Sequence, residues 1–313
     1  MLRNLFTEEH DDFRAMIRTF LAKEVAPEFP KWEKAGASMP LHSPPVPDQM
    51  VMPHLWENVF LALVGIPALV ALGWALRSWR RTGDPLYLVV LVGGTLCSLL
   101  EPLVDILGQC WYPRGAQFEV FELMGRPIPL FAVIGYTMMF GGYTLLTLEI
   151  LKRKSPRSLW WVWLGGIFFT AIFEFFATHT GSYAYYGDQP LRIFSWPSWW
   201  GPVNSLVAMV CAVFITVLRP HLRGWRVLVV AVLIPVFDGA VNAAAAWPVY
   251  TTNWSDVPPI ARQLSGVATF AISALLLGLL IAIAEHGVRP ISSNTQSYND
   301  LPPVRPEPKE SPR

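Results

Sequence analysis

The stretch LWENVFLALVGIPALVALGWAL, residues 55–76, is almost wholly apolar and ends where a cluster of arginines begins. A helix needs about 20 predominantly apolar residues to cross a bilayer, and this stretch has that length. Further stretches of the same kind follow at residues 86–107, 128–151, 159–178, 199–218, 225–247 and 263–284. We therefore expect an all-α polytopic membrane protein, a bundle of seven transmembrane helices.

The composition agrees with this expectation. Hydrophobic residues make up 53% of the chain and charged residues only 15%, against roughly 25% charged in soluble domains. A net charge of +1 argues against a nucleic acid partner. Cys97, Cys110 and Cys211 are too few and too scattered for a disulfide framework or a cysteine metal site. Since no zinc spacing, P-loop or GxSxG sequence is present, we expect no metal and no cofactor.

Basic residues predict the orientation of the helices. They gather in the loops after the first, third and fifth stretches and in the C-terminal tail. The positive-inside rule places these segments in the cytoplasm, so the chain enters the first helix from outside and its C-terminus is cytoplasmic. We expect a multi-pass protein of the cell membrane. The membrane domain spans residues 51–286, and residues 287–313, rich in Pro, Ser and charge, are expected to form a disordered tail.

Residues 1–50 differ from the rest of the chain. A soluble amphipathic helix is predicted, with Thr7 as its N-cap and an apolar stripe of Phe13, Met16, Ile17, Phe20 and Leu21. Residues 3–36 resemble the first helix of acyl-CoA dehydrogenases, but the flavin-binding and catalytic parts of that family have no counterpart downstream. We expect this segment to be dispensable, with Met50 or Met52 as a possible alternative start.

Four carboxyl groups lie inside or at the edge of the apolar stretches: Glu101, Asp105, Glu174 and Asp238. A charged group at the centre of a bilayer costs about 2.5–3.5 kcal/mol on insertion scales. With the predicted orientation, all four belong to the outer half of the membrane, which indicates a shared polar cavity. Glu174 stands among three phenylalanines, a setting that suits a general acid. We therefore expect these four residues to be catalytic.

Other polar side chains fall at a similar depth and are predicted to bind substrate. They are Arg126, Tyr136, His179, Asn204 and Asn242. Structural alternatives remain for several of these groups. Glu101 and Asp105 could be partners of Arg126, a protonated Glu174 could bridge helices, and His179 could be a surface histidine. Glu57 and Asn58 could join the pocket or face lipid headgroups.

Aromatic residues crowd the predicted outer loops. They form either an interfacial belt or a lid over an apolar substrate. These residues are Trp111, Tyr112, Tyr183, Tyr185, Tyr186, Phe194, Trp196, Trp199 and Trp200.

Two stretches carry a resemblance to a known family. EPLVDILGQCWYPRGAQFEVFELMGRPIPLFAVIGYTMMFGG (residues 101–142) and FEFFATHTGSYAYYG (residues 173–187) resemble the actinobacterial AveC family of membrane spirocyclases. The similarity extends over most of residues 52–286. It implies dehydration and spiroketal formation, the reactions of the family's founding member in polyketide biosynthesis, a branch of secondary metabolism.

Together these observations predict an acid–base cyclase or dehydratase acting on a hydrophobic polyketide or isoprenoid-like substrate in the lipid bilayer. Glu174 or Glu101 is the expected acid, and Asp238 the expected base or cation stabiliser. The alternative is a non-enzymatic lipid-binding or transport protein that uses the same cavity.

Overall fold

The structure of the protein is a computed structural model that describes residues 8–27 and 44–287. Within these residues, seven helical segments are long and apolar enough to cross a membrane, which confirms the predicted set of seven membrane helices. They run over His54–Thr82, Leu86–Gly108, Leu130–Arg153, Pro156–His179, Trp200–His221, Gly224–Ala245 and Pro259–His286. The predicted tail beyond residue 287 lies outside the described residues.

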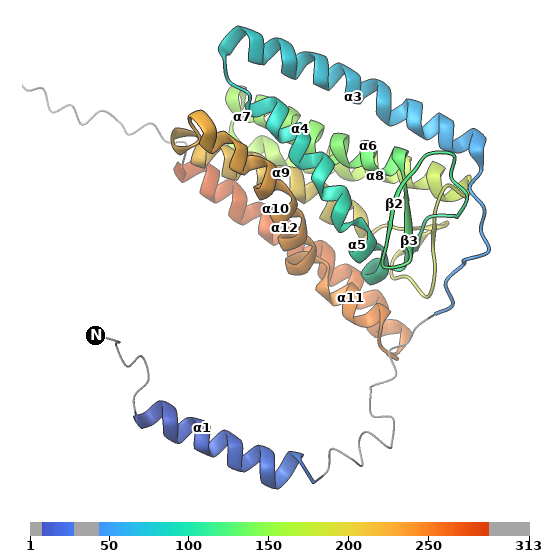
Figure 1. The fold of residues 1–313 in the computed structure, drawn as a ribbon, viewed down its shortest axis with the longest axis vertical. Coiled ribbons are helices and arrows are strands. Elements are labelled where there is room, and N and C mark those ends of the chain that lie inside the picture. The colour runs from blue at the N-terminus through green and yellow to red at the C-terminus, as the bar shows by residue number, and fades with distance from the viewer. Residues whose placement is uncertain (1–7, 28–43, 288–313) are drawn as a thin grey trace, which may run out of the picture.

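Helix α9 (Trp200–Leu218) is the centre of the bundle. It packs against α7 (Tyr143–Arg153), α8 (Leu159–His179), α10 (Val230–Ala245) and α12 (Pro259–Gly287) (Figure 1). Apolar residues occupy nearly its whole circumference, so neighbours can cover it on all sides. By contrast, α3 (His54–Thr82) lies along one edge, contacts mainly α4 and α6, and leaves most of its surface exposed.

The second and third membrane segments are not continuous α-helices. In the second, α4 (Leu86–Cys97) passes through a 3₁₀ turn, η2 (Ser98–Leu100), into α5 (Glu101–Gly108). Pro102 has no N–H to donate and is favoured in the first turn of a helix, so a new helix begins here. In the third, a π-helical segment, η3 (Thr137–Gly142), joins α6 (Leu130–Tyr136) to α7. Segments of this type often mark functional sites.

The loops at one end of the bundle form three small antiparallel sheets and a short helix (Figure 1). Strand β1 (Cys110–Trp111) pairs with β4 (Ala184–Tyr185), β2 (Glu119–Leu123) with β3 (Arg126–Pro129), and β5 (Arg192–Ile193) with β6 (Trp196–Pro197). Helix α11 (Trp247–Asn253) follows α10. This part of the molecule is called the loop end below.

Glu57 holds these loops in place. Its buried carboxylate accepts hydrogen bonds from the backbone N–H groups of Gln117 (2.9 Å) and Phe118 (3.0 Å). Asn58 donates to the Gln117 side chain at 2.9 Å. Both polar residues at the start of α3 therefore fasten a loop.

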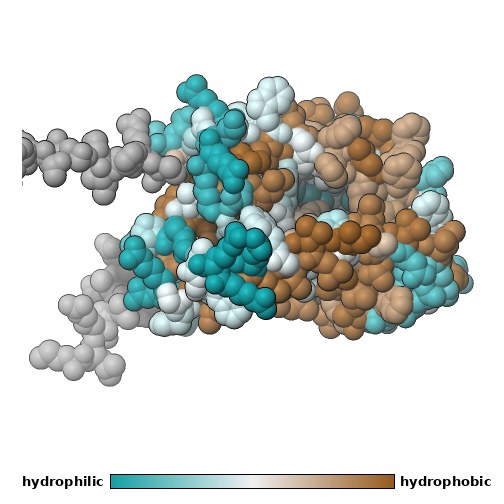
Figure 2. Space-filling model, turned by 90° about the horizontal axis from the view of Figure 1, so that it is seen from above, coloured by the Kyte–Doolittle hydropathy of each residue, from teal (hydrophilic) through white to brown (hydrophobic). Residues whose placement is uncertain are grey.

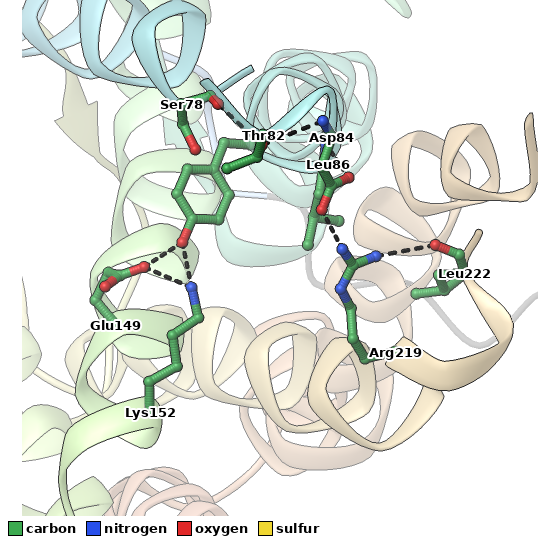
Figure 3. A network of polar contacts seen from close by, with 9 residues as sticks. Ser78, Thr82, Asp84, Leu86, Glu149, Lys152, Arg219 and Leu222 are labelled. Atoms are coloured by element: carbon green, nitrogen blue, oxygen red, sulfur yellow. Dashed lines mark hydrogen bonds and ion pairs between the residues drawn. The ribbon is translucent and has the colours of Figure 1, made fainter. Parts of the chain in front are cut away.

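The opposite end of the bundle carries a network of ion pairs (Figure 3). Glu149 accepts hydrogen bonds from Tyr87 and from Lys152, and Arg219 pairs with Asp84. The short helices η4 (Pro156–Ser158), η5 (Arg219–His221) and η6 (Gly224–Val229) also lie at this end, which is called the basic end below. Figure 2 shows apolar residues covering the middle of one face and hydrophilic residues gathered at both ends, as expected for a chain that crosses a bilayer.

The N-terminal segment contains the predicted helix. Helix α1 (Glu8–Phe20) continues as a π-helical turn, η1 (Leu21–Val25), and the stripe residue Phe13 is exposed. Thr7, the predicted N-cap, lies outside the described residues. Residues 44–50, assigned to the linker from sequence, partly pack on the loop end: Pro44 is buried and the Met50 carbonyl accepts the Arg114 N–H at 3.1 Å.

The crossing of α4 and η3 yields a test of the packing. A Cβ at Gly94 would overlap the backbone of Gly141, whereas one at Gly65 on α3 would meet nothing within 4 Å. Overpacking a core costs about 1–3 kcal/mol, and backbone cannot rotate away as a side chain can. We expect Gly94→Val to lower the thermal midpoint and monodisperse yield in detergent, with Gly65→Val close to wild type. Equal behaviour of the two variants would contradict this helix crossing.

A candidate active site of buried carboxyl groups

Glu101 occupies the first position of α5, directly after the 3₁₀ turn. The turn directs its side chain into the protein, where it is buried. One carboxylate oxygen accepts a hydrogen bond from the Tyr112 hydroxyl at 2.8 Å, and the other accepts one from the Tyr136 hydroxyl. Both oxygens are therefore held by tyrosines, one from a loop and one from α6.

Asp105 lies one helical turn beyond Glu101 and is also buried. Its Oδ2 atom has no hydrogen-bond partner among the described residues. The neighbouring Cys110 thiol faces this carboxyl group and is only a weak donor. Asp105 thus presents a buried oxygen that no strong donor satisfies.

Glu174 lies on α8 and meets the loop end from another side. It is buried, and its Oε2 accepts a hydrogen bond from the Tyr185 hydroxyl at 3.1 Å. The Tyr183 hydroxyl also faces this carboxyl group. The pairing of β1 with β4 sets Tyr185 opposite Cys110, so strand register joins the loop whose Tyr185 bonds Glu174 to the loop whose Tyr112 bonds Glu101.

Asp238 lies on α10, three residues after Pro235, and is almost fully buried. Its Oδ1 accepts a hydrogen bond from the Asn242 amide at 3.0 Å, and Asn242 in turn accepts one from the Tyr250 hydroxyl at 2.7 Å. Its Oδ2 has no partner among the described residues. As in Asp105, one carboxyl oxygen is left available.

Groups in the loops show that these carboxyls form one cluster. Burial raises the pKa of Tyr250 well above its usual value, and the charges of Asp238, Glu101 and Asp105 raise it further. The pKa of Cys110 is raised well above its usual value by burial first, then by Asp105, Glu101 and Glu174. The pKa values of one tyrosine and one thiol are therefore raised by carboxyl groups from three helices, α5, α8 and α10.

The tyrosines that hold the carboxyls remain hydrogen-bond donors over the physiological pH range. Burial, followed by the charge of Glu101, raises the pKa of Tyr112 well above its usual value of about 10. Burial and the charge of Glu174 do the same for Tyr183 and Tyr185. Their hydroxyl protons thus stay in place to satisfy the buried acids.

Buried aromatic rings pack together at the same end of the bundle. Trp199 and Trp200 stack with ring centroids 4.1 Å apart, and Tyr250 stands edge-on to both. Trp200 packs on Gly108 so closely that a Cβ there would overlap its ring. Tyr185 lies 6.3 Å from Trp200 between centroids. These rings pack on one another at the loop end, and the faces of aromatic rings attract positive charge.

Arg126, predicted from the sequence to bind substrate, borders the carboxyl cluster. It is buried, donates to the Cys110 carbonyl at 3.0 Å and to the Tyr186 hydroxyl at 2.6 Å, and lies over the Trp111 ring at 4.9 Å. It is close enough to Asp105 to interact electrostatically. No ion pair with a carboxylate appears for it among the described residues, so it neutralises the cluster only from a distance.

The structure brings together most of the predicted site residues. Glu101, Asp105, Glu174, Asp238, Tyr136 and Asn242 meet in the cluster, and Arg126 borders it. His179 is exposed and stacks on Phe175, outside the buried cluster. Asn204 is half-buried on α9 and makes no side-chain hydrogen bond among the described residues. Within those residues, no group of His, Cys, Asp and Glu is arranged to hold a metal ion.

Sequence reasoning did not assign roles to the loop tyrosines. Tyr112, Tyr183 and Tyr185 hold carboxyl groups, although they were interpreted as either an interfacial belt or a lid. Tyr250 was not singled out at all. The available signal was the density of tyrosines in WYP (residues 111–113) and YAYY (residues 183–186), because phenylalanine serves equally well where only apolar bulk is needed.

Comparisons with protein-family models, with curated proteins and with solved structures give no match.

Burial of the cluster predicts how Cys110 reacts. At pH values below the pKa of an exposed thiol, about 8.5, the thiolate fraction rises about tenfold per pH unit. The rate of alkylation rises with it. Because the pKa of Cys110 is raised, its thiol stays protonated over that range. In a Cys97→Ala, Cys211→Ala background, we expect negligible alkylation of the folded protein from about pH 6 to 8, and complete alkylation after denaturation, measured by mass spectrometry. A tenfold rise per pH unit in the folded protein, as expected for a Ser155→Cys control, would show that Cys110 is not buried.

Proposed function

We propose that this protein is a membrane-embedded acid–base cyclase or dehydratase of the spiroketal-forming type. The observation that carries the proposal is the cluster itself: buried carboxyl groups from α5, α8 and α10 gather at the loop end, and Asp105 and Asp238 each keep an oxygen with no partner among the described residues. The resemblance to the AveC family supports the reaction type. The substrate would be a hydrophobic polyketide or isoprenoid-like molecule that enters from the bilayer.

In the proposed reaction, two hydroxyl groups of one substrate molecule become joined to the ketone carbon of the same molecule. Two C–O bonds form, and the carbonyl oxygen leaves as water after accepting two protons. The two hydroxyl protons are released, so the reaction is a net loss of one water. It requires an acid for the departing oxygen, a base for the attacking hydroxyls, and stabilisation of the oxocarbenium ion between the two additions.

The contacts favour a division of these roles. Glu101 accepts hydrogen bonds at both oxygens, so it is positioned to stabilise positive charge and less available for proton transfer. Glu174 has its Oε2 held by Tyr185, with the Tyr183 hydroxyl also facing the group, and its place on a different helix among phenylalanines makes it our candidate for the acid. Asp238, oriented by Asn242, has a free oxygen and is the candidate base, with Asp105 as a second acceptor.

The aromatic rings at the loop end would serve the same chemistry. The faces of Trp199, Trp200 and Tyr250 would stabilise an oxocarbenium ion by cation–π attraction. Closing the cluster from water would also disfavour return to the open hydroxy ketone. In this proposal Tyr136 and Asn242 orient the carboxyl groups, while Arg126, Asn204 and His179 are left for substrate contacts farther out.

The alternative, a lipid-binding or transport protein, uses the same cluster without chemistry. A transporter needs access to its site from both faces of the membrane. The buried charged groups gather at the loop end, whereas the buried polar residues toward the basic end are mainly hydroxyl-bearing, such as Thr144, Thr147 and Ser273. This one-sided distribution favours an enzyme.

We further propose that the loop end faces outward and the basic end lies in the cytoplasm of a cell-membrane protein. Glu119 and Ser155 are exposed residues at the two ends. In a background lacking the native cysteines, an impermeant thiol reagent should label Glu119→Cys in intact cells, and Ser155→Cys only after permeabilisation. The reverse pattern would place the carboxyl cluster near the cytoplasmic face.

Substitution of the carboxyls tests the proposed reaction. Glu174→Gln and Asp238→Asn keep the size of each group but remove proton transfer, which contributes about 10²–10⁴-fold in rate. We expect both variants to express normally and at least one to abolish product formation. The measurement compares lipid extracts of cells with the gene, without it, and with each variant, seeking a compound one water lighter than its accumulating precursor.

Glu122→Gln is the matched control, because Glu122 is an exposed carboxylate at the same end and pairs only with Arg114. It should retain full product formation. Full turnover in both cluster variants would end the cyclase proposal. Collapse of both variants in detergent, with the control intact, would instead support a structural role for the buried acids.

A further inference from the structure

Three arginines form an exposed cluster where α3 reaches the basic end. Arg77, Arg80 and Arg81 are spaced i, i+3 and i+4, so they share one face of the helix. Gly73 lies one turn earlier on the same face, and a Cβ there would meet nothing within 4 Å. Gly73, Leu76 and the arginines line a surface hollow of about 360 Å³, called the α3 hollow below.

These arginines differ from other basic residues nearby. Lys152 and Arg153 pair with Glu149, and Arg157 pairs with Glu285. Within residues 8–27 and 44–287, no carboxylate pairs with Arg77, Arg80 or Arg81. No carboxylate of the described residues therefore neutralises their charges, which stand exposed.

A second hollow provides an internal comparison. It measures about 230 Å³ and lies at the next turn, lined by Asp84, Arg219 and Arg223 among others. Figure 3 shows Asp84 pointing at the Arg219 guanidinium, so this hollow already contains a counter-charge. Because the α3 hollow has none, it is the better anion site of the two.

The surface around the α3 hollow is that of a membrane interface. Trp74 and Trp79 are exposed on α3, and tryptophan favours the boundary between hydrocarbon and water. Toward the middle of the helix, on the side of Gly73 and Arg77, Ile66, Leu69 and Val70 are exposed. An apolar track of exposed side chains thus leads along α3 from the hydrocarbon region to the arginines. Neighbouring helices cover little of the α3 surface.

We propose that the α3 hollow binds the phosphate headgroup of an anionic phospholipid. Arginine side chains bind phosphate oxygens with bidentate hydrogen bonds, and a cluster of them beside a membrane helix attracts anionic lipids. The notch at Gly73 gives room for the glycerol backbone, and the acyl chains lie along the exposed apolar face of α3. Free phosphate would match the arginines but would leave this apolar track unused.

The test uses the purified, delipidated full-length protein and native mass spectrometry with phosphatidylglycerol, phosphatidylcholine or inorganic phosphate added. Wild type should bind phosphatidylglycerol in preference to phosphatidylcholine. Each arginine near a membrane surface contributes about fivefold in binding, so Arg77→Gln, Arg80→Gln and Arg81→Gln together should weaken retention by about 100-fold. Arg157→Gln, at the same end but paired with Glu285, is the matched control and should bind as wild type does.

Gly73→Leu serves as a second variant that keeps all charges, in case the triple variant folds poorly. It should fill the hollow and weaken phosphatidylglycerol binding by at least tenfold. The proposal is overturned if both variants bind as wild type does, or if phosphatidylcholine binds equally well. Displacement of the lipid by inorganic phosphate at similar concentration would also overturn it and indicate a site for free phosphate.

Discussion

Burial of carboxyl groups inside an apolar helix bundle is the constraint on which the loop end depends. Placing a charged side chain at the centre of a membrane helix costs about 2.5–3.5 kcal/mol of insertion free energy. One hydrogen bond to a charged group stabilises it by about 1.5–3 kcal/mol. Glu101, with two tyrosine donors, can recover its cost. Asp238 has one amide donor and the Cys97 thiol, and Asp105 only the Cys110 thiol, so among the described residues both remain under-compensated. The loops must fold over the bundle because they supply these donors.

This constraint links distant parts of the chain. Tyr112 and Tyr185 come from different loops, yet both donate to acids on membrane helices. The β1–β4 pairing that joins the two loops is only two residues long on each strand. So short a sheet contributes little stability by itself. The hydrogen bonds of the tyrosines to the acids and the anchoring of the next loop on Glu57 support the same loops, so the contacts of the site also hold the loop fold.

The sequence predicted the helices well because hydrophobic length is a local property that each segment carries alone. It also placed Glu101, Asp105, Glu174 and Asp238 at one depth, since position along a helix follows from residue count. It could not predict rotation about the helix axis: the 3₁₀ turn at Ser98–Leu100 and the π segment at Thr137–Gly142 change which side faces inward without changing hydropathy. It missed the donor role of the loop tyrosines and the anchoring role of Glu57, because both depend on partners far away in the chain.

The irregular turns in the second and third membrane segments affect the direction of Glu101 and of its partner Tyr136. A continuous α-helix advances 100° per residue and would fix the direction of Glu101 from that of Leu91, which packs on the Gly141 backbone. The tighter 3₁₀ turn changes the direction of the side chains just before Glu101. The wider π segment changes it just after Tyr136, the hydrogen-bond partner of Glu101. The close α4–η3 packing at Gly94 and the hydrogen bond between Tyr136 and Glu101 therefore lie on either side of these two irregular segments. The packing of the bundle and the geometry of this acid thus depend on the same short stretches of backbone.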